Sequence, residues 1–371
     1  MIQSEKIRVV VAMSGGVDSS VAAALLKEQG YDVIGVSLKL WDYDEEERVI
    51  QGKTCCSLDD IADAKSVCDT LGIPFYAFNH KKEFRKQVID VFVDEYAHGR
   101  TPNPCVLCNQ HLKFDVLLDE AKRLGARYLA TGHFARIVHD AAGIPALLKA
   151  RDTAKDQSYV LFSLTQNNLD RILFPLGDFT KEAVRGMAKR FGLITHDKTE
   201  SMDICFIPNN DHASFIAKHY PQAKRKPGNF ITETGAVLGE HKGIHAYTVG
   251  QRRGLSVSAG ERLYVKEIRA NTDEVVLSRG EDLLFDTAVA RDFRFIRSPS
   301  GQPLGAKTRY QRDDIPVQIR QYDELSGRME ICFENPARAV TPGQALVLYE
   351  GDEVIGGGWI AAAKPVTQVI L

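Results

Sequence analysis

Glycines, hydroxyls and one carboxylate are concentrated in the stretch AMSGGVDSS at residues 12–20. Gly15 and Gly16 allow a tight turn with a close backbone approach to an anion, and the neighbouring serine hydroxyls add hydrogen-bond donors. Asp18 is a poor phosphate ligand, so binding Mg²⁺ is the better role for it. The stretch lacks the Gly-Lys-Ser/Thr of the common nucleoside triphosphate loop. It predicts a phosphate-binding turn without a lysine of its own, and a glycine turn with a capping serine is the simpler alternative.

Thiols form a second set of reactive side chains. The chain holds seven cysteines, an odd number that argues against a secreted disulfide framework. Thiol chemistry, metal binding or plain burial are the expected uses. The positions are Cys55, Cys56, Cys68, Cys105, Cys108, Cys205 and Cys332.

The elements around the loop alternate between strand and helix patterns. Residues 7–13 are almost continuously apolar, which is typical of a buried parallel strand, and a small-residue helix begins near Ser19 and ends at Gly30. Periodicity predicts further strands and helices. The strands lie at 32–40, 73–80 and 126–138, and the helices at 58–72 and 114–125. This order predicts an α/β fold with a doubly wound parallel sheet, whose ligands bind at the carboxyl ends of the strands.

The composition changes near residue 210. A basic stretch with Pro and Gly at 217–231 ends the α/β rhythm, and short β-rich runs separated by turn residues follow it. We therefore expect three domains: 1–212, a small β-rich domain at 213–283, and a β-barrel at 284–371.

The overall composition is that of a soluble globular protein, with 371 residues, 44% hydrophobic and 26% charged. No apolar run approaches the ~20 residues of a membrane span. The first strand starts too early to leave room for a signal peptide, so we expect a cytoplasmic protein with no membrane partner. The net charge of −2 indicates no global affinity for nucleic acid, but residues 288–320 hold seven basic and three acidic side chains. Such a patch is a candidate phosphate contact, and a solvated surface is the simpler interpretation.

The loop at 12–20 resembles the signature of the ATP pyrophosphatases. These enzymes split ATP between its α and β phosphates, pass AMP to a substrate oxygen and hold the pyrophosphate in this loop. The resemblance accounts for the missing lysine, because the lysine of the common loop assists transfer of the γ-phosphate. It implies ATP and Mg²⁺ as cofactors, and it leaves the activated substrate open.

Five further segments, in order, make the chain similar to the tRNA-specific 2-thiouridylases from residue 8 to about 360. They are GRTPNPCVLCNQHLKF at 99–114, ATGHFAR at 130–136, KDQSYVLFSL at 155–164, ESMDICFIP at 200–208 and YTVGQRRGL at 247–255. This family replaces O2 of the wobble uridine with sulfur. Adenylation makes that oxygen a leaving group, and a low-pKa cysteine can carry the incoming sulfur as a persulfide. The implied partners are tRNA, which the β-rich domains would grip, and an upstream persulfide donor such as a cysteine desulfurase or a relay protein.

The resemblance also implies roles for individual residues. It assigns the persulfide to Cys205 and the partner nucleophile to Cys108. Either the terminal sulfur attacks the adenylated uridine directly, or Cys108 first releases it as sulfide, and both routes end in a Cys108–Cys205 disulfide. The implied nucleotide site comprises Ala12, Met13, Ser14, Gly15, Gly16, Val17, Asp18, Ser19, Leu38 and Gly132. The implied tRNA contacts are Asn103, Pro104 and Cys105 at the target base, and His133, Lys155, Asp156, Gln157, Arg309, Tyr310 and Gln344 elsewhere.

Cys105 departs from the family pattern, because well-known bacterial members have an Asp there that has been cast in acid–base work. A thiol fits that role poorly, so the role is either dispensable or filled by another group. Cys105, Cys108 and Cys205 together offer three thiolates for an iron–sulfur cluster, an alternative that stays open and that we do not favour. A structural zinc would want a fourth ligand. We interpret the other four cysteines as structural.

Two other functions remain open at this level. Another ATP pyrophosphatase, such as an amide-forming synthetase or a different sulfurtransferase, would need neither TPNPCVLCN nor a second cysteine near residue 205. A non-catalytic RNA-binding module with a vestigial loop would have no use for Asp18 and both cysteines.

Overall fold

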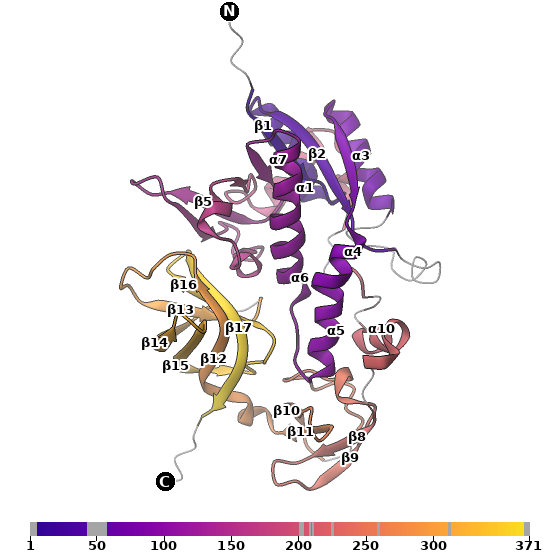
Figure 1. Ribbon diagram of the computed structural model, residues 1–371, viewed down its shortest axis with the longest axis vertical. Coiled ribbons are helices and arrows are strands. Elements are labelled where there is room, and N and C mark those ends of the chain that lie inside the picture. Colours follow the sequence, from indigo (N-terminus) through magenta and orange to yellow (C-terminus); the bar gives the residue numbers. More distant parts are fainter. Residues whose placement is uncertain are drawn as a thin grey trace, which may run out of the picture. The chain divides into compact units, whose positions relative to one another are not determined.

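The computed structural model in Figure 1 describes most of the chain. The described residues are 6–42, 58–199, 204–207, 209, 211–223, 226–257, 260–310 and 313–366. The chain divides into two compact units. The first contains residues 1–88, 105–210 and 352–354, and the second contains residues 89–104, 211–351 and 355–371.

A five-stranded parallel sheet organises the first unit (Figure 1). Its order is β3 (Phe75–Asn79), β2 (Asp32–Lys39), β1 (Arg8–Ala12), β4 (Tyr128–Ala130) and β7 (Ile172–Leu173). Val11 of β1 pairs with Gly35 on one side and with Ala130 on the other. The chain builds outward through β2 and β3, then returns to place β4 on the other side of β1. Loops after β1 and β4 therefore meet at the switch point where such sheets bind ligands, and the predicted parallel α/β fold is confirmed.

Helices and short turns complete the first unit. The α-helices are α1 (Val17–Glu28), α3 (Leu58–Leu71), α4 (Lys81–Phe84), α7 (Leu117–Arg123), α8 (Gln166–Leu169) and α9 (Lys181–Arg190). The π-helices are η1 (Arg85–Ile89) and η2 (Cys108–Val116). The 3₁₀-helices are η3 (Ser158–Leu161) and η4 (Ile194–Asp197). Nine residues of α1 are buried, and Val21 packs in one core with Val9, Val184 and Ala188. This burial explains why small apolar residues fill the helix on nearly every side.

Two predicted elements differ from those observed. The strand expected at 126–138 is split into β4 and β5 (Ala135–His139), because the chain leaves the sheet at Thr131 and re-enters extended structure after Phe134. β5 pairs instead with β6 (Pro145–Lys149) as an antiparallel hairpin. The helix expected at 114–125 begins earlier, since η2 is a π-helical segment that starts at Cys108 and runs into α7.

The second unit contains a four-stranded sheet of order β10-β11-β8-β9. Its strands are β8 (Gly228–Ile231), β9 (Val237–His241), β10 (Tyr264–Arg269) and β11 (Glu274–Ser278). Phe230, Tyr247, Val265 and Leu277 form its core. The same unit includes α5 (Asp90–Ala97), α10 (His212–His219), η6 (Pro221–Ala223), η7 (Ile244–Ala246) and η8 (Gly280–Leu283).

A closed six-stranded barrel also belongs to the second unit, seen in orange and yellow in Figure 1. The strands are β12 (Leu284–Phe295), β13 (Leu304–Lys307), β14 (Ile315–Asp323), β15 (Arg328–Arg338), β16 (Ala345–Glu350) and β17 (Glu353–Pro365). Pairing between β12 and β17 closes it. Phe293, Ile331, Leu346 and Ile360 fill its interior. The predicted barrel is confirmed, and within the described ranges no helix has the length and apolarity to cross a membrane.

Candidate functional site

The turn after β1 has the shape expected of an anion-binding loop. Met13 N donates to Val36 O at 2.8 Å and Ser37 Oγ donates to Met13 O at 2.6 Å, which fixes the start of the turn on β2. Gly15 has a φ of +70°, and a side chain there would overlap the backbone of Asp60. Gly16 is the N-cap residue of α1 and makes no side-chain capping hydrogen bond. The N-terminus of such a helix favours an anion, because its first N–H groups and the helix dipole both point positive charge outward.

The serine hydroxyls shape this turn from within. Ser19 Oγ lies 3.2 Å from both Ser14 N and Ser14 Oγ and donates to Gly16 O at 3.3 Å. Ser20 is fully buried, and its Oγ donates to Gly16 O at 2.8 Å. Ser20 therefore stabilises the first turn of α1, and the expectation that its hydroxyl contacts phosphate is not supported by its position.

A lysine from a distant part of the chain lies at the loop. Lys181 Nζ donates to both carboxylate oxygens of Asp18, at 2.7 and 2.8 Å. It is the first residue of α9, and its backbone N donates to Asp152 Oδ2 at 2.9 Å. The ammonium also lies 5.5 Å from the centre of the Phe134 ring, and the side chain is only 11% exposed. Sequence reasoning missed Lys181. Thr180 and Lys181 indicate only the start of a helix, and nothing in the sequence links that helix to Asp18.

The charge at Asp18 bears on the expected Mg²⁺ site. A carboxylate is the right kind of ligand for Mg²⁺, but both oxygens of Asp18 are engaged by Lys181. Among the residues that the structure describes, no group of three His, Cys, Asp or Glu side chains gathers as a metal site. Within the described residues Asp18 is therefore not part of a three-ligand metal site, and its binding of Mg²⁺ stays a prediction.

The loop after β4 packs directly against the phosphate turn. A Cβ at Gly132 would lie 2.6 Å from Ser19 N and 3.0 Å from Asp18 Cβ, so any side chain there would displace the turn. Lys198 steadies the other side through ion pairs with Asp60, at 2.7 Å, and Asp63, at 2.5 Å. Leu38 lies half-buried near the carboxyl end of β2, beside Phe78. Its assignment to the nucleotide site stays a prediction.

His133 is a buried side chain with polar neighbours at both ring nitrogens. Its Nδ1 lies 2.7 Å from Thr131 Oγ1 and its Nε2 lies 3.5 Å from Lys113 Nζ. Burial, reinforced by the charge of Lys113, holds the pKa of His133 well below its usual value. With 7% of its surface exposed, His133 offers little area for a direct RNA contact.

The segment at 155–157 is tied to the rest of the first unit. Asp156 Oδ1 accepts from Ala150 N at 3.0 Å and Asp156 Oδ2 accepts from Ser158 Oγ at 2.8 Å. Gln157 exchanges two hydrogen bonds with the backbone of Phe134, at 2.8 and 2.9 Å. Asp156 and Gln157 therefore support the loop, and half-buried Lys155 is the residue of the three with the right charge to meet RNA phosphate.

The two predicted reactive cysteines lie on distinctive backbone in the first unit, and both are partly exposed. Cys108 opens the π-helical segment η2, a geometry that is frequent at functional sites. Asn109 anchors that opening, since its side chain is 2% exposed and Nδ2 donates to Val160 O at 3.1 Å. Cys205 lies in a turn closed by Ile207 N and Ile204 O at 3.0 Å. The buried ring of Phe206 holds this turn against Phe84, with centroids 5.7 Å apart.

The remaining cysteines differ in how exposed their side chains are. Cys105 is exposed, and it does not join Cys108 and Cys205 in any three-ligand group within the described ranges, so the three thiolates of an iron–sulfur cluster are not assembled. Cys68 is fully buried, and burial raises the pKa of its thiol to about 12, which agrees with a structural role. Cys332 is partly exposed on β15, with Arg320 Nη2 3.4 Å from its sulfur. Cys55 and Cys56 lie outside the described residues.

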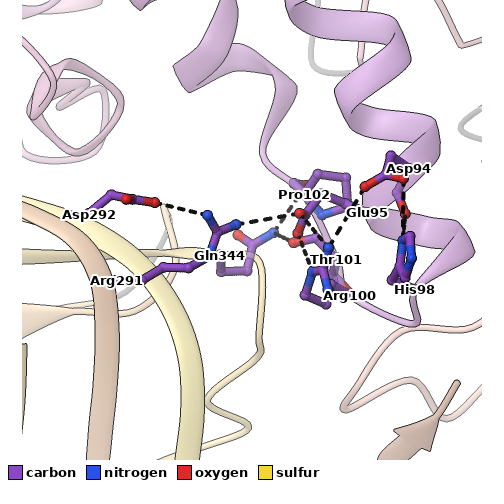
Figure 2. Close-up of polar contacts among 9 residues, drawn as sticks. All are labelled: Asp94, Glu95, His98, Arg100, Thr101, Pro102, Arg291, Asp292 and Gln344. Atoms are coloured by element: carbon purple, nitrogen blue, oxygen red, sulfur yellow. Dashed lines mark hydrogen bonds and ion pairs between the residues drawn. The ribbon is translucent and has the colours of Figure 1, made fainter. Parts of the chain in front are cut away.

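The other predicted tRNA contacts belong to the second unit, apart from Cys105. Arg309 Nη2 donates to Val249 O and Ala339 O at 3.0 Å and to Thr341 Oγ1 at 2.8 Å. Gln344 Nε2 donates to Thr101 O at 2.9 Å and to Pro102 O at 3.3 Å (Figure 2). Asn103, Pro104 and Tyr310 have buried or half-buried side chains. Arg309 and Gln344 thus have internal partners, which favours structural roles for these two side chains over the direct tRNA contacts that the sequence predicts.

A phosphate turn at the switch point of a parallel sheet, in a chain that also forms a closed β-barrel, defines a nucleotide-dependent enzyme of modular build. Three family models agree with this class. They are described as tRNA methyl transferase HUP domain over residues 7–209, tRNA methyl transferase PRC-barrel domain over 213–279 and aminomethyltransferase beta-barrel domain over 285–360.

Relatives narrow the class to one family. A protein named tRNA-specific 2-thiouridylase MnmA from Geobacter metallireducens is 49% identical, over 98% of this chain and 99% of that protein. One of the same name from Carboxydothermus hydrogenoformans is 45% identical, over 95% and 97%. A solved 4-thiouridine synthetase–RNA complex with bound ATP is 19% identical with a TM-score of 0.34, covering 58% of this chain and 50% of its own. The chain belongs to the tRNA-specific 2-thiouridylase family.

Proposed function

We propose that this protein catalyses the ATP-dependent 2-thiolation of the wobble uridine of tRNA. The observation that carries the proposal is the identity of 45–49% with 2-thiouridylases over at least 95% of the chain. The phosphate turn at 12–19 supports it, since adenylation needs a site for the departing pyrophosphate. Residues 1–212 would perform the chemistry, while 213–283 and 284–371 would bind tRNA in the cytoplasm.

In the first step, O2 of the uridine attacks the α-phosphorus of ATP and pyrophosphate leaves. The first-turn N–H groups of α1 would hold the pyrophosphate, because a helix N-terminus stabilises negative charge. Mg²⁺ would be bound by phosphate oxygens together with Asp18, and would neutralise charge on the leaving group. Lys181 would then turn from Asp18 toward the phosphates, which supplies the cation that the loop itself lacks.

In the second step, the sulfur replaces the adenylated oxygen. The terminal sulfur of a Cys205 persulfide attacks C2, and AMP leaves with the electrons of the C2–O bond. Cys108 thiolate attacks the Cys205 sulfur, which leaves the transferred sulfur on C2 as a thiocarbonyl and forms the Cys108–Cys205 disulfide. In the other order, Cys108 first expels the sulfur as hydrosulfide, which then attacks C2. Either way two thiols are oxidised, so a thiol reductant must reopen the disulfide and a persulfide-carrying protein must reload Cys205.

The two available descriptions of the family imply different products. Its domain models mention methyl transfer, whereas its full-length relatives are named for thiolation. A methyl transferase would need no cleavage of ATP and no pair of reactive cysteines, so we favour thiolation. An amide-forming synthetase would likewise need no cysteine pair, and an RNA-binding module would release no pyrophosphate.

The test is a reconstituted reaction with purified protein, unmodified tRNA transcript, MgATP, and cysteine with a cysteine desulfurase. We expect nucleoside mass spectrometry to find 2-thiouridine at the wobble position, with AMP and pyrophosphate released in equal amounts. Absence of 2-thiouridine, or release of ADP in place of AMP, would contradict the proposal.

A further inference from the structure

A short strap, residues 99–104, joins α5 to α6 (Pro104–Leu107). It ends with two of the three residues assigned to the target base, Asn103 and Pro104. Residues 100–103 have no regular secondary structure. Nevertheless Thr101 is only 9% exposed and Pro102 is buried. Buried backbone outside helices and sheets must obtain its hydrogen bonds from elsewhere, and in the second unit the barrel supplies them.

The barrel holds the strap through the connection between β15 and β16. Thr101 N donates to Pro342 O at 2.9 Å, and Gln344 Nε2 donates to the carbonyls of Thr101 and Pro102 (Figure 2). Gly343 lies between these two contacts with a φ of +90°, and a Cβ there would come within 2.8–2.9 Å of the Thr101 backbone. Gln344 is itself fixed to β17, since its O accepts from Ile360 N at 2.8 Å.

An ionic contact holds the strap at its other end. Arg100 donates to both carboxylate oxygens of Glu95, at 2.7 and 2.8 Å. Arg291 of β12 donates to the same carboxylate at 3.4 Å and to Asp292 at 2.9 Å, as Figure 2 shows. The Glu95 side chain is only 10% exposed, so this carboxylate depends on its two guanidinium partners.

We infer that Gln344 and Arg291 are positioning residues that set the place of the target-base segment on the barrel. The carboxamide of Gln344 is engaged by two strap carbonyls, so its structural role is to satisfy them. A barrel that binds tRNA would thereby also carry Asn103 and Pro104 to the base. The expected effect on thiolation rests on the proposed function. The expected hold of Gln344 and Arg291 on the strap rests on the contacts of the free protein alone.

The central test is Gln344→Glu, which keeps the shape of the side chain and removes both donated hydrogen bonds. The matched control is Gln318→Glu, which makes the same charge change on the exposed face of β14. In the free protein, we expect amide exchange of a peptide covering 98–104 to rise about tenfold or more in Gln344→Glu, since two buried carbonyls lose their donor. The control should exchange like the wild type.

Measurements of kcat and of the Kd for tRNA distinguish a positioning role of Gln344 from a direct contact with RNA. Gln344→Glu should lower kcat for thiolation about tenfold while leaving the Kd for tRNA and its salt dependence within about twofold of the control. Unchanged amide exchange, or a weakened Kd with unchanged kcat, would overturn the inference. If the wild type forms no 2-thiouridine, the proposed function fails, but the exchange experiment still decides whether Gln344 holds the strap.

Two further comparisons guard against a variant that merely misfolds. Gly343→Ala changes no charge but places a methyl against Thr101, so it should reproduce the Gln344→Glu exchange and kcat. Arg291→Ala should accelerate strap exchange, whereas Arg294→Ala removes an equal charge from β12 and should not. Equal exchange in Arg291→Ala and Arg294→Ala would contradict the ionic part of the inference.

Discussion

Asp18 and Lys181 are 163 positions apart, yet they form an ion pair at the phosphate turn. At the scale of single residues, this pair brings to the phosphate turn a cation that the loop itself lacks. A lysine within the loop would be a permanent phosphate ligand. Here Lys181 Nζ donates to the carboxylate of Asp18, and the proposed mechanism has it turn to the phosphates when ATP binds.

We predict that Lys181→Met weakens ATP binding about tenfold to a hundredfold, because a charged hydrogen bond is worth roughly 1.5–3 kcal/mol and Asp18 would then repel the phosphates. AMP, which lacks the β and γ phosphates, should lose much less affinity. Calorimetric titration of both nucleotides measures the effect. Lys189→Met, an exposed lysine on the last turn of α9, is the control. Equal losses for ATP and AMP would argue against a phosphate role for Lys181.

His133 should make stability depend on pH. Its depressed pKa means that the unfolded chain takes up a proton below about pH 6.5 while the folded protein does not. Stability is therefore intact above that pH and falls as the pH drops, by about 1.4 kcal/mol per unit until the folded pKa is reached. His133→Gln should flatten the fall in melting temperature between pH 7 and 5.5. Some slope will remain, because the pKa values of His212 and His241 are also lowered by burial. Identical slopes in both proteins would mean that His133 is not buried neutral.

At the scale of elements, the two cysteines are presented by segments of different character. Cys108 opens a π-helical segment that runs into α7, while Cys205 lies on a short turn anchored by Phe206. A disulfide needs Cα atoms about 4.4–6.8 Å apart, so the shared chemistry requires these two segments to meet during the reaction. We therefore expect at least one of the two segments to move when tRNA binds or leaves.

We predict that Cys205→Ser loses both the persulfide and thiolation, whereas Cys108→Ser keeps the persulfide and fails to turn over. Intact-protein mass spectrometry after loading with a desulfurase detects the added sulfur. Cys105→Ser should remain active and colourless, and Cys332→Ser on β15 serves as the control. A brown protein with bound iron and sulfide, inactive as Cys105→Ser, would replace the persulfide route with a cluster.

At the scale of the whole molecule, fewer basic side chains are exposed to bind RNA phosphate than the number of Lys and Arg residues indicates. Among the seven basic residues of 288–320, Lys307 is 9% exposed, Arg309 holds backbone carbonyls, and Arg291 is paired with Glu95 and Asp292. Arg312 lies outside the described residues. Exposed side chains such as Arg294 are better candidates for phosphate contacts than the buried ones.

We predict that tRNA affinity falls with salt at a log–log slope of about −0.7 to −0.9 per phosphate neutralised. Arg294→Ala should reduce that slope by about one such step. Arg309→Ala should instead lower the free energy of unfolding by about 1.5–3 kcal/mol and leave the slope unchanged. The reason is that the Arg309 guanidinium donates its hydrogen bonds to acceptors within the protein. Filter binding across a salt series, alongside thermal melts, separates the two effects. A salt-independent affinity would remove RNA phosphates as the basis of binding.

The sequence by itself determined the features that depend on neighbours in the chain. An apolar strand, a Gly-Gly turn and a small-residue helix predict the phosphate turn and the parallel sheet, because backbone preferences and periodicity act over a few residues. Motif order was enough for the family. The family resemblance singled out Cys108 and Cys205, whose reactive roles stay a prediction, but it did not indicate the π-helical backbone at Cys108.

Only the tertiary structure decided which polar side chains are already engaged. Lys181 on Asp18, Arg309 on three acceptors and Gln344 on the strap are contacts between distant segments, and composition counts such side chains without assigning their partners. Asp156 and Gln157 likewise proved to be loop supports. The physical reason is that a buried polar group must be satisfied wherever the fold places it, and the fold brings together residues that the sequence separates by as many as 243 positions.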